Sequence, residues 1–172
     1  MIATQSQTAT PATLATPAAE TIHRSDVPNQ RMHDASRFPL VRLRRRSVQP
    51  GYAFAWGAEM QRLLALKAPF VIVAEYCADE PADDLRLRSA WLRSNRSALA
   101  MYCRGLIVIE PRIEARASTR EIVRGMCSGS GLRLVVVSGM RVANELAPVL
   151  LKHSGPDLSK PPSIAKPRLQ MP

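Results

Sequence analysis

Residues 70–74 read Phe70-Val71-Ile72-Val73-Ala74, a continuous apolar run typical of a strand that is covered on both faces of a sheet. Similar runs follow at residues 106–109 (LIVI) and 132–137 (LRLVVV). Segments with the apolar spacing of helices lie between them. This alternation predicts right-handed crossovers and a mostly parallel sheet with helices on both faces.

The segments between the apolar runs predict the first two helices. One covers residues 54–66, and its apolar residues are Phe54, Trp56, Met60, Leu63, Leu64 and Leu66. The other is a long helix over residues 81–104, with Asp83 or Asp84 in its first turn and Gly105 directly after its end. Its inward stripe is expected to comprise Leu87, Trp91, Ala98, Leu99 and Tyr102.

Two further helices are predicted toward the end of the chain. Residues 118–121 (STRE) have the spacing of a capping box, with Ser118 at the N-cap. Ser118 is also a candidate phosphorylation site, because a phosphate is stabilised at a helix N-terminus, and a plain cap is the alternative. Ser138 is expected to cap the last helix, whose apolar stripe is Met140, Ala143, Leu146, Ala147 and Leu150.

The first strand is predicted at residues 40–44, near an edge of the sheet because its polar side is all arginine. The expected fold is therefore one α/β domain over residues 37–151, with the order β-α-β-α-β-α-β-α and a mostly parallel four-stranded sheet. Residues 1–36 are rich in Ala, Thr and Pro, and residues 152–172 are rich in Pro and Lys. Such compositions bury too little apolar surface to offset ordering entropy, which predicts disordered tails at both ends.

Charge and cysteine content narrow the function classes. The formal net charge is +10, of which residues 51–151 contribute only +3, so much of the excess lies on the flanks. The three cysteines form no CxxC or Cys/His cluster, so neither a disulfide framework nor a metal site is expected, and no cofactor is predicted. No apolar run approaches the ~20 residues that cross a bilayer, and no secretion signal is recognisable. A cytoplasmic location is expected.

Ligands of open α/β sheets bind at the carboxyl ends of the strands. In this chain the rule selects residues 45–49, 76–84, 110–118 and 138–141. The second segment is strongly acidic, and its carboxylates could hold Mg²⁺ or could simply complement the dipole of the following helix. Cys77 follows a strand and precedes a helix, where a thiolate is favoured, but the core holds no histidine to act as its base. A small buried cysteine is the alternative.

The strongest charge feature is the arginine segment over residues 37–46. Its members are Arg37, Arg42, Arg44, Arg45 and Arg46. As a nucleic-acid arm it would give a log–log salt slope of about −4 to −5. It lacks the interleaved aromatic residues that stack on bases, and it could equally protect a sheet edge or dock an acidic protein.

Three stretches of the chain resemble small bacterial proteins of the STAS-like class, whose fold is shared with the sporulation anti-sigma-factor antagonists. They are residues 69–76 (PFVIVAEY), 90–96 (AWLRSNR) and 103–109 (CRGLIVI). The resemblance implies a domain that works by binding an anti-sigma kinase, a transporter core, a small ligand or a membrane surface. The better-studied antagonists carry a phosphorylatable serine at the start of the helix after the central strand. Residues 80–84 here read EPADD, without that serine.

The preferred hypothesis is a non-enzymatic regulatory or accessory module that acts through protein–protein contacts. Its expected contact residues are Tyr76, Cys77, Asp79, Glu80, Asp83, Asp84 and Arg112. The first alternative is a nucleic-acid-binding regulator that uses the arginine segment. The second is a small enzyme that uses Cys77 or the carboxylates of residues 79–84.

Overall fold

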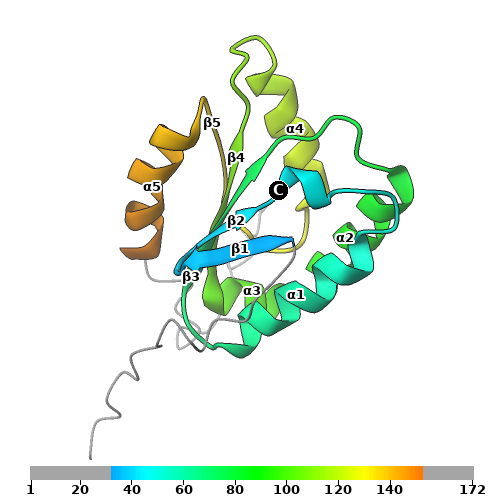
Figure 1. The fold of residues 1–172 in the computed structure, drawn as a ribbon, viewed down its shortest axis with the longest axis vertical. Helices are drawn as coiled ribbons and strands as arrows, with labels where there is room; N and C mark the ends of the chain where they lie inside the picture. The colour runs from blue at the N-terminus through cyan, green and yellow to red at the C-terminus, as the bar shows by residue number, and fades with distance from the viewer. Residues whose placement is uncertain (1–31, 153–172) are drawn as a thin grey trace, which may run out of the picture.

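The computed structural model describes residues 32–152, which form a five-stranded sheet flanked by helices (Figure 1). The strands are β1 (His33–Arg37), β2 (Leu40–Leu43), β3 (Phe70–Glu75), β4 (Cys103–Ile109) and β5 (Leu134–Val137), and they lie in the order β1-β2-β3-β4-β5. β1 is antiparallel to β2, and all later pairs are parallel. The helices are α1 (Ala53–Ala65), α2 (Ala82–Ser94), α3 (Arg96–Tyr102), α4 (Arg116–Met126) and α5 (Met140–Lys152), with the 3-10 helix η2 (Arg45–Ser47) after β2. The predicted α/β domain with a mostly parallel sheet is confirmed.

The strand order explains how the helices are distributed over the two faces. From β2 onward each strand is added beside its predecessor, so right-handed crossovers place α1 to α4 on the same face. Of the helices within residues 32–152, α5 alone covers the other face, where it packs on β3 and β4 (Figure 1). The helices therefore lie on both faces, as expected, but unequally.

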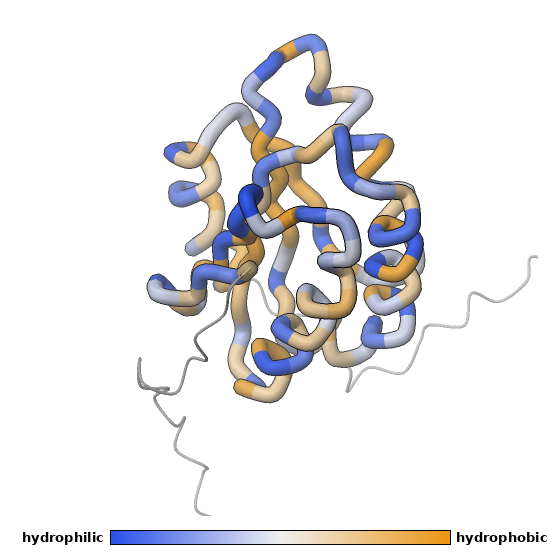
Figure 2. The backbone as a smooth tube through the Cα atoms, turned by 45° about the vertical axis from the view of Figure 1, so that its right-hand side comes forward, coloured by the Kyte–Doolittle hydropathy of each residue, from blue (hydrophilic) through white to orange (hydrophobic). Residues whose placement is uncertain are grey.

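The two central strands bury both of their faces. Val71, Val73 and Ile107 belong to the core beneath α5, whereas Phe70 and Ile72 belong to the core beneath the other helices. Figure 2 shows the hydrophobic colour concentrated in these central strands, with hydrophilic residues along the outer sides of the helices. The continuous apolar runs in the sequence follow from this double burial.

The predicted four-stranded sheet was one strand short. β1 lies within residues 33–37, most of which had been assigned to the disordered N-terminal tail, and it forms the sheet edge in place of β2. Although the sequence of β1 is polar, one of its faces is buried, because His33 and Ala35 pack toward α1. Lys152 is the last residue of α5, so the predicted C-terminal tail began one residue early. The predicted disorder of residues 1–31 and 153–172 lies outside the described residues.

The predicted long helix over residues 81–104 is wrong, because the structure forms two helices interrupted at Asn95. The Asn95 side chain donates to the Trp91 carbonyl oxygen at 2.9 Å, a local hydrogen bond that competes with helix continuation. Cys103 already belongs to β4, and Gly105 lies inside that strand instead of ending a helix. A Cβ atom on Gly105 would lie 3.3 Å from the Arg133 carbonyl oxygen, so close strand packing favours glycine there.

Several predicted helix faces and starts also differ. Leu87, expected to face inward, is 43% exposed, and Phe54, an apolar residue of the first predicted helix, is 76% exposed. Ser118 does not cap its helix: α4 begins at Arg116, and the Ser118 hydroxyl donates to the Ala115 carbonyl oxygen at 2.9 Å from within the first turn. The start of α5 was predicted one residue too early, because the first helical hydrogen bond is accepted by Gly139 and not by Ser138.

The apolar stripe of α5 is confirmed: Ala143, Ala147 and Leu150 are buried, and Met140 and Leu146 pack beside them. None of the helices in the described part of the chain is long and apolar enough to cross a membrane.

Candidate functional site

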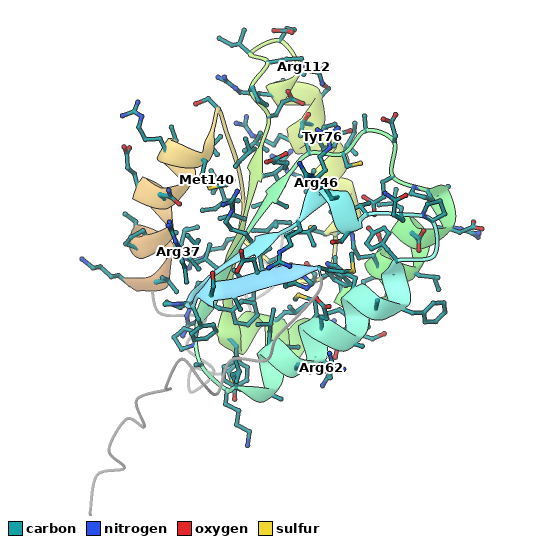
Figure 3. The ribbon with its side chains drawn as sticks, viewed as in Figure 1. Arg37, Arg46, Arg62, Tyr76, Arg112 and Met140 are labelled. Carbon is teal, nitrogen blue, oxygen red and sulfur yellow. The ribbon has the colours of Figure 1, made fainter. Side chains whose placement is uncertain are left out.

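The carboxyl ends of the four parallel strands surround an open cleft of about 700 Å³, which we call the strand-end cleft. It is lined by Arg42, Arg45, Glu75, Tyr76, Ala78, Ile109, Glu110, Pro111, Arg112, Gly139 and Met140. All four segments that the strand-end rule selected from the sequence contribute to it. Figure 3 shows Tyr76, Arg112 and Met140 toward the same end of the molecule.

The strand-end cleft carries three arginines and two glutamates, Glu75 and Glu110. Arg42 is contributed by β2, Arg45 by η2 and Arg112 by the loop after β4, and all three are exposed. Arg42 shares the sheet face of Leu40, which is the face covered by α5 beneath the neighbouring strands. The N-terminus of α5 adds its positive dipole end at Gly139 and Met140.

One acidic residue of the cleft is already neutralised. Glu110 is 3% exposed, and its carboxylate accepts hydrogen bonds from Arg112 Nε at 3.0 Å and Arg112 Nη2 at 3.1 Å. These bonds hold the pKa of Glu110 below its usual value. Arg116 donates to the carbonyl oxygens of Glu110 and Pro111, at 3.0 and 2.8 Å, and so holds the loop between β4 and α4 in place. The side chains of Arg42 and Arg45 remain exposed to meet an anionic group.

The acidic segment over residues 79–84 does not form a common site. Asp84 is buried and accepts hydrogen bonds from the amides of Gly51 at 2.7 Å and Ala53 at 2.9 Å, so it caps the start of α1. Asp83 is exposed and pairs with Arg86 at 2.5 Å, and Asp79 is exposed on the loop. Among residues 32–152, no three His, Cys, Asp or Glu side chains are grouped as metal ligands.

Glu80, the remaining carboxylate of the segment, belongs to a buried polar network. It accepts a hydrogen bond from the Tyr52 hydroxyl and lies 3.0 Å from Arg88 Nη2. Arg88 Nη1 donates to the same hydroxyl at 2.8 Å, and burial raises the pKa of Tyr52. Glu80 and Arg88 of this network line a second, partly open cavity next to the cleft, together with Tyr76 and Cys77.

The five arginines of the predicted nucleic-acid arm are not brought to one place. Arg42 and Arg45 line the strand-end cleft, whereas Arg37 pairs with Leu40 at the opposite end of β2. Arg44 forms an ion pair with Asp34 at 3.7 Å, and Arg46 is exposed on η2. Figure 3 shows Arg37 and Arg46 well separated along the molecule.

Arg42 and Arg45, predicted only as members of the arginine segment, share a cleft with Tyr76 and Arg112. The place of Arg45 in the cleft could have been predicted from the sequence, since Arg45 belongs to a segment that the strand-end rule selects. Ser118 lies exposed on α4 and is not among the lining residues of the cleft.

No protein-family model, curated protein or solved structure matches this chain. What the domain binds is therefore inferred from its own residues.

Proposed function

We propose that this domain is a non-enzymatic regulatory or accessory module that binds an acidic segment of a partner protein in the strand-end cleft. The observation that carries the proposal is the convergence of Arg42, Arg45 and Arg112, from three different elements, with the N-terminus of α5 around one cleft. The guanidinium group matches carboxylate geometry with two parallel hydrogen bonds, so two exposed arginines favour a ligand with more than one carboxylate.

Two neighbouring side chains favour a protein as the ligand. Tyr76 is half-buried in the wall of the cleft, and Ile113, next to Arg112, is 77% exposed on the loop after β4. Tyrosine and arginine are enriched among the residues that contribute most to protein–protein binding. A partner segment that alternates acidic and apolar residues would contact both kinds of side chain.

The resemblance to the STAS-like class supports the same mode of action, since proteins of that class work through binding. Only some of the contact residues predicted from the sequence line the strand-end cleft. Tyr76 and Arg112 line the cleft. Asp79 and Asp83 are exposed and do not line it. Cys77 and Glu80 line the second cavity, and Asp84 caps α1.

The nucleic-acid and enzyme alternatives draw less support from the geometry. Phosphate contacts along a backbone need a continuous basic surface, whereas Arg37 lies apart from Arg45 and Arg44 is paired with Asp34. The Asp84 and Glu80 carboxylates are already engaged by groups of the fold, which leaves them poorly placed to act on a substrate.

The test is capture of partners from nuclease-treated lysate by the full chain and by two charge-reversed variants. Arg42→Glu with Arg45→Glu changes the cleft, and Arg62→Glu with Arg120→Glu makes the same charge change at exposed positions of α1 and α4. Arg62 lies at the far end of the molecule in Figure 3.

We expect one stoichiometric protein to be retained by the wild type and by the control variant and lost by the cleft variant. Retention should weaken as salt is raised, because exposed charge pairs are screened. Equal retention by both variants would refute the assignment to the cleft. Recovery of nucleic acid from untreated lysate, with no protein after nuclease treatment, would favour the nucleic-acid alternative instead.

A further inference from the structure

A partly open cavity of about 130 Å³ lies between the sheet and the helices α1, α2 and α4; we call it the inner cavity. Most of its wall is apolar, with Ile72 and Val108 from the sheet and Trp56, Leu92, Val123 and Met126 from the helices. Well-packed interiors leave few voids larger than a water molecule, so a cavity of this size is exceptional. An apolar cavity of about 150 Å³ binds benzene. The inner cavity is close to that size, which suits a ligand of about one six-membered ring.

Arg88 supplies the one cationic side chain in this wall. The residue is only 9% exposed, and its guanidinium carbon lies 5.7 Å from the centre of the Trp56 ring. Nη1 donates to the Tyr52 hydroxyl, and Nη2 contacts Glu80 and the Met126 sulfur. The Nε–H group has no hydrogen-bond partner within the described residues. A buried donor without an acceptor is unfavourable, so an acceptor atom on a bound molecule would be stabilised there.

The charge of Arg88 is already balanced, because Glu80 lies 3.0 Å from Nη2. A carboxylate entering the inner cavity would approach Glu80 as well as Arg88, and burying a second anion there is costly. A neutral acceptor meets the Nε–H group without that penalty. The geometry thus favours an uncharged ligand.

The inner cavity has a rim on one side. Tyr76, Cys77 and Ala78, on the loop after β3, line it together with Ile122 of α4, which is 52% exposed. A small molecule would therefore enter between this loop and α4. Cys77 is half-buried at this rim, which provides a reporter on occupancy.

From these observations we infer that the inner cavity binds a small, uncharged, largely apolar molecule, about the size of a six-membered ring, whose carbonyl-type oxygen accepts a hydrogen bond from Arg88 Nε. The inner cavity adjoins the strand-end cleft, with which it shares Tyr76 and Ala78. Its test does not depend on finding a protein partner.

The experiment titrates the full chain with three probes and follows the two tryptophans, the indole signal of Trp56 in particular, by NMR. Cyclohexanone carries the acceptor, methylenecyclohexane has nearly the same shape without it, and cyclohexanecarboxylate adds a charge. We expect saturable binding of cyclohexanone, about tenfold weaker binding of methylenecyclohexane, and weaker binding still of the carboxylate.

Alkylation of Cys77 at pH 8 gives a second measurement. Cys103 and Cys127 are buried, and burial raises their pKa values to about 12 and about 11, so Cys77 should react first. Cyclohexanone should slow this reaction in proportion to the occupancy seen by NMR.

The variant Ala74→Leu fills the inner cavity, because Ala74 lines it, and Ala90→Leu is a matched control on the exposed side of α2. We expect Ala74→Leu to fold with an unchanged or higher Tm and to lose cyclohexanone binding, while Ala90→Leu binds as the wild type does. Undiminished binding by a folded Ala74→Leu variant, or no saturable binding of any probe to the wild type, would overturn the site. Equal affinity for the ketone and the alkene would overturn the role of Arg88, and tighter binding of the carboxylate would overturn the choice of an uncharged ligand.

Discussion

The replacement of Glu59 by glutamine is expected to weaken the fold at its N-terminal edge strand. Glu59 lies on α1, and its side chain is 7% exposed. Its carboxylate accepts hydrogen bonds from the amide of Met32 at 3.1 Å, the amide of His33 at 2.9 Å and the His33 ring Nδ1 at 3.0 Å. Glutamine keeps the shape, but it has one acceptor oxygen, and its amino group would face a backbone donor.

The loss in the free energy of unfolding follows from the hydrogen bonds that lose their charged acceptor. A hydrogen bond to a charged group contributes about 1.5–3 kcal/mol, against about 0.5–1.5 kcal/mol for a neutral one. The two shortest bonds, both to His33, each weaken by about 1 kcal/mol, and the mismatched donor at Met32 adds to this loss. We therefore expect Glu59→Gln to lower the free energy of unfolding by about 2–3 kcal/mol, a large share of the about 5–15 kcal/mol typical of a domain.

Urea unfolding followed by tryptophan fluorescence measures this loss, because Trp56 lies beside His33, with ring centres 6.2 Å apart. Glu121→Gln is the matched control, since Glu121 is exposed and pairs only with Arg124 in the described structure. Hydrogen exchange at the His33 amide should quicken in Glu59→Gln alone. A change below about 0.5 kcal/mol, or an equal loss in Glu121→Gln, would refute the reasoning that a charged acceptor holds β1.

Three further outcomes are expected. Asp84→Ala leaves the amides of Gly51 and Ala53 without their acceptor, so the free energy of unfolding, measured in urea, should fall by about 2 kcal/mol. Asp83→Ala, at an exposed position, should change it little. Gly105→Ala should lower the free energy of unfolding by about 1–3 kcal/mol, because the added Cβ would approach the Arg133 carbonyl oxygen and Leu150. Unchanged stability would show that β4 and β5 separate easily. Burial lowers the pKa of His33 from 6.5, so the unfolded chain binds the proton more readily than the folded one. The free energy of unfolding should therefore fall as the pH drops below about 6.5, by at most about 1.4 kcal/mol per pH unit. His33→Gln should flatten that pH dependence, and an unchanged slope would place its origin elsewhere.

Part of this fold could be predicted from local pattern alone. The run from Phe70 to Ala74 is apolar at every position, so it had to be a strand covered on both faces. The stripe of Ala143, Ala147 and Leu150 has helical spacing and is buried as expected. The strand-end rule also selected the right segments for the candidate site, because a parallel sheet brings all its carboxyl ends to one edge.

Other features depended on partners far away in the chain. β1 has a polar sequence and is held by Glu59, more than twenty residues downstream. Asp84 caps α1, which precedes it in the chain, and not the helix in which it stands. The spacing of apolar residues indicates which side of an element is buried, but not which distant polar group will satisfy a buried amide.

The sequence by itself determined the alternation of the four parallel strands with helical segments, because hydrophobic periodicity and chain breaks are local properties. Only the tertiary structure decided the fifth strand, the glycine inside β4 and the meeting of Arg42 and Arg45 with Arg112. It also decided that α2 buries Asp84 and Arg88 while leaving Leu87 at the surface. The physical reason is that hydrogen bonding and charge pairing inside a domain are long-range in sequence, so they are settled when the elements pack together.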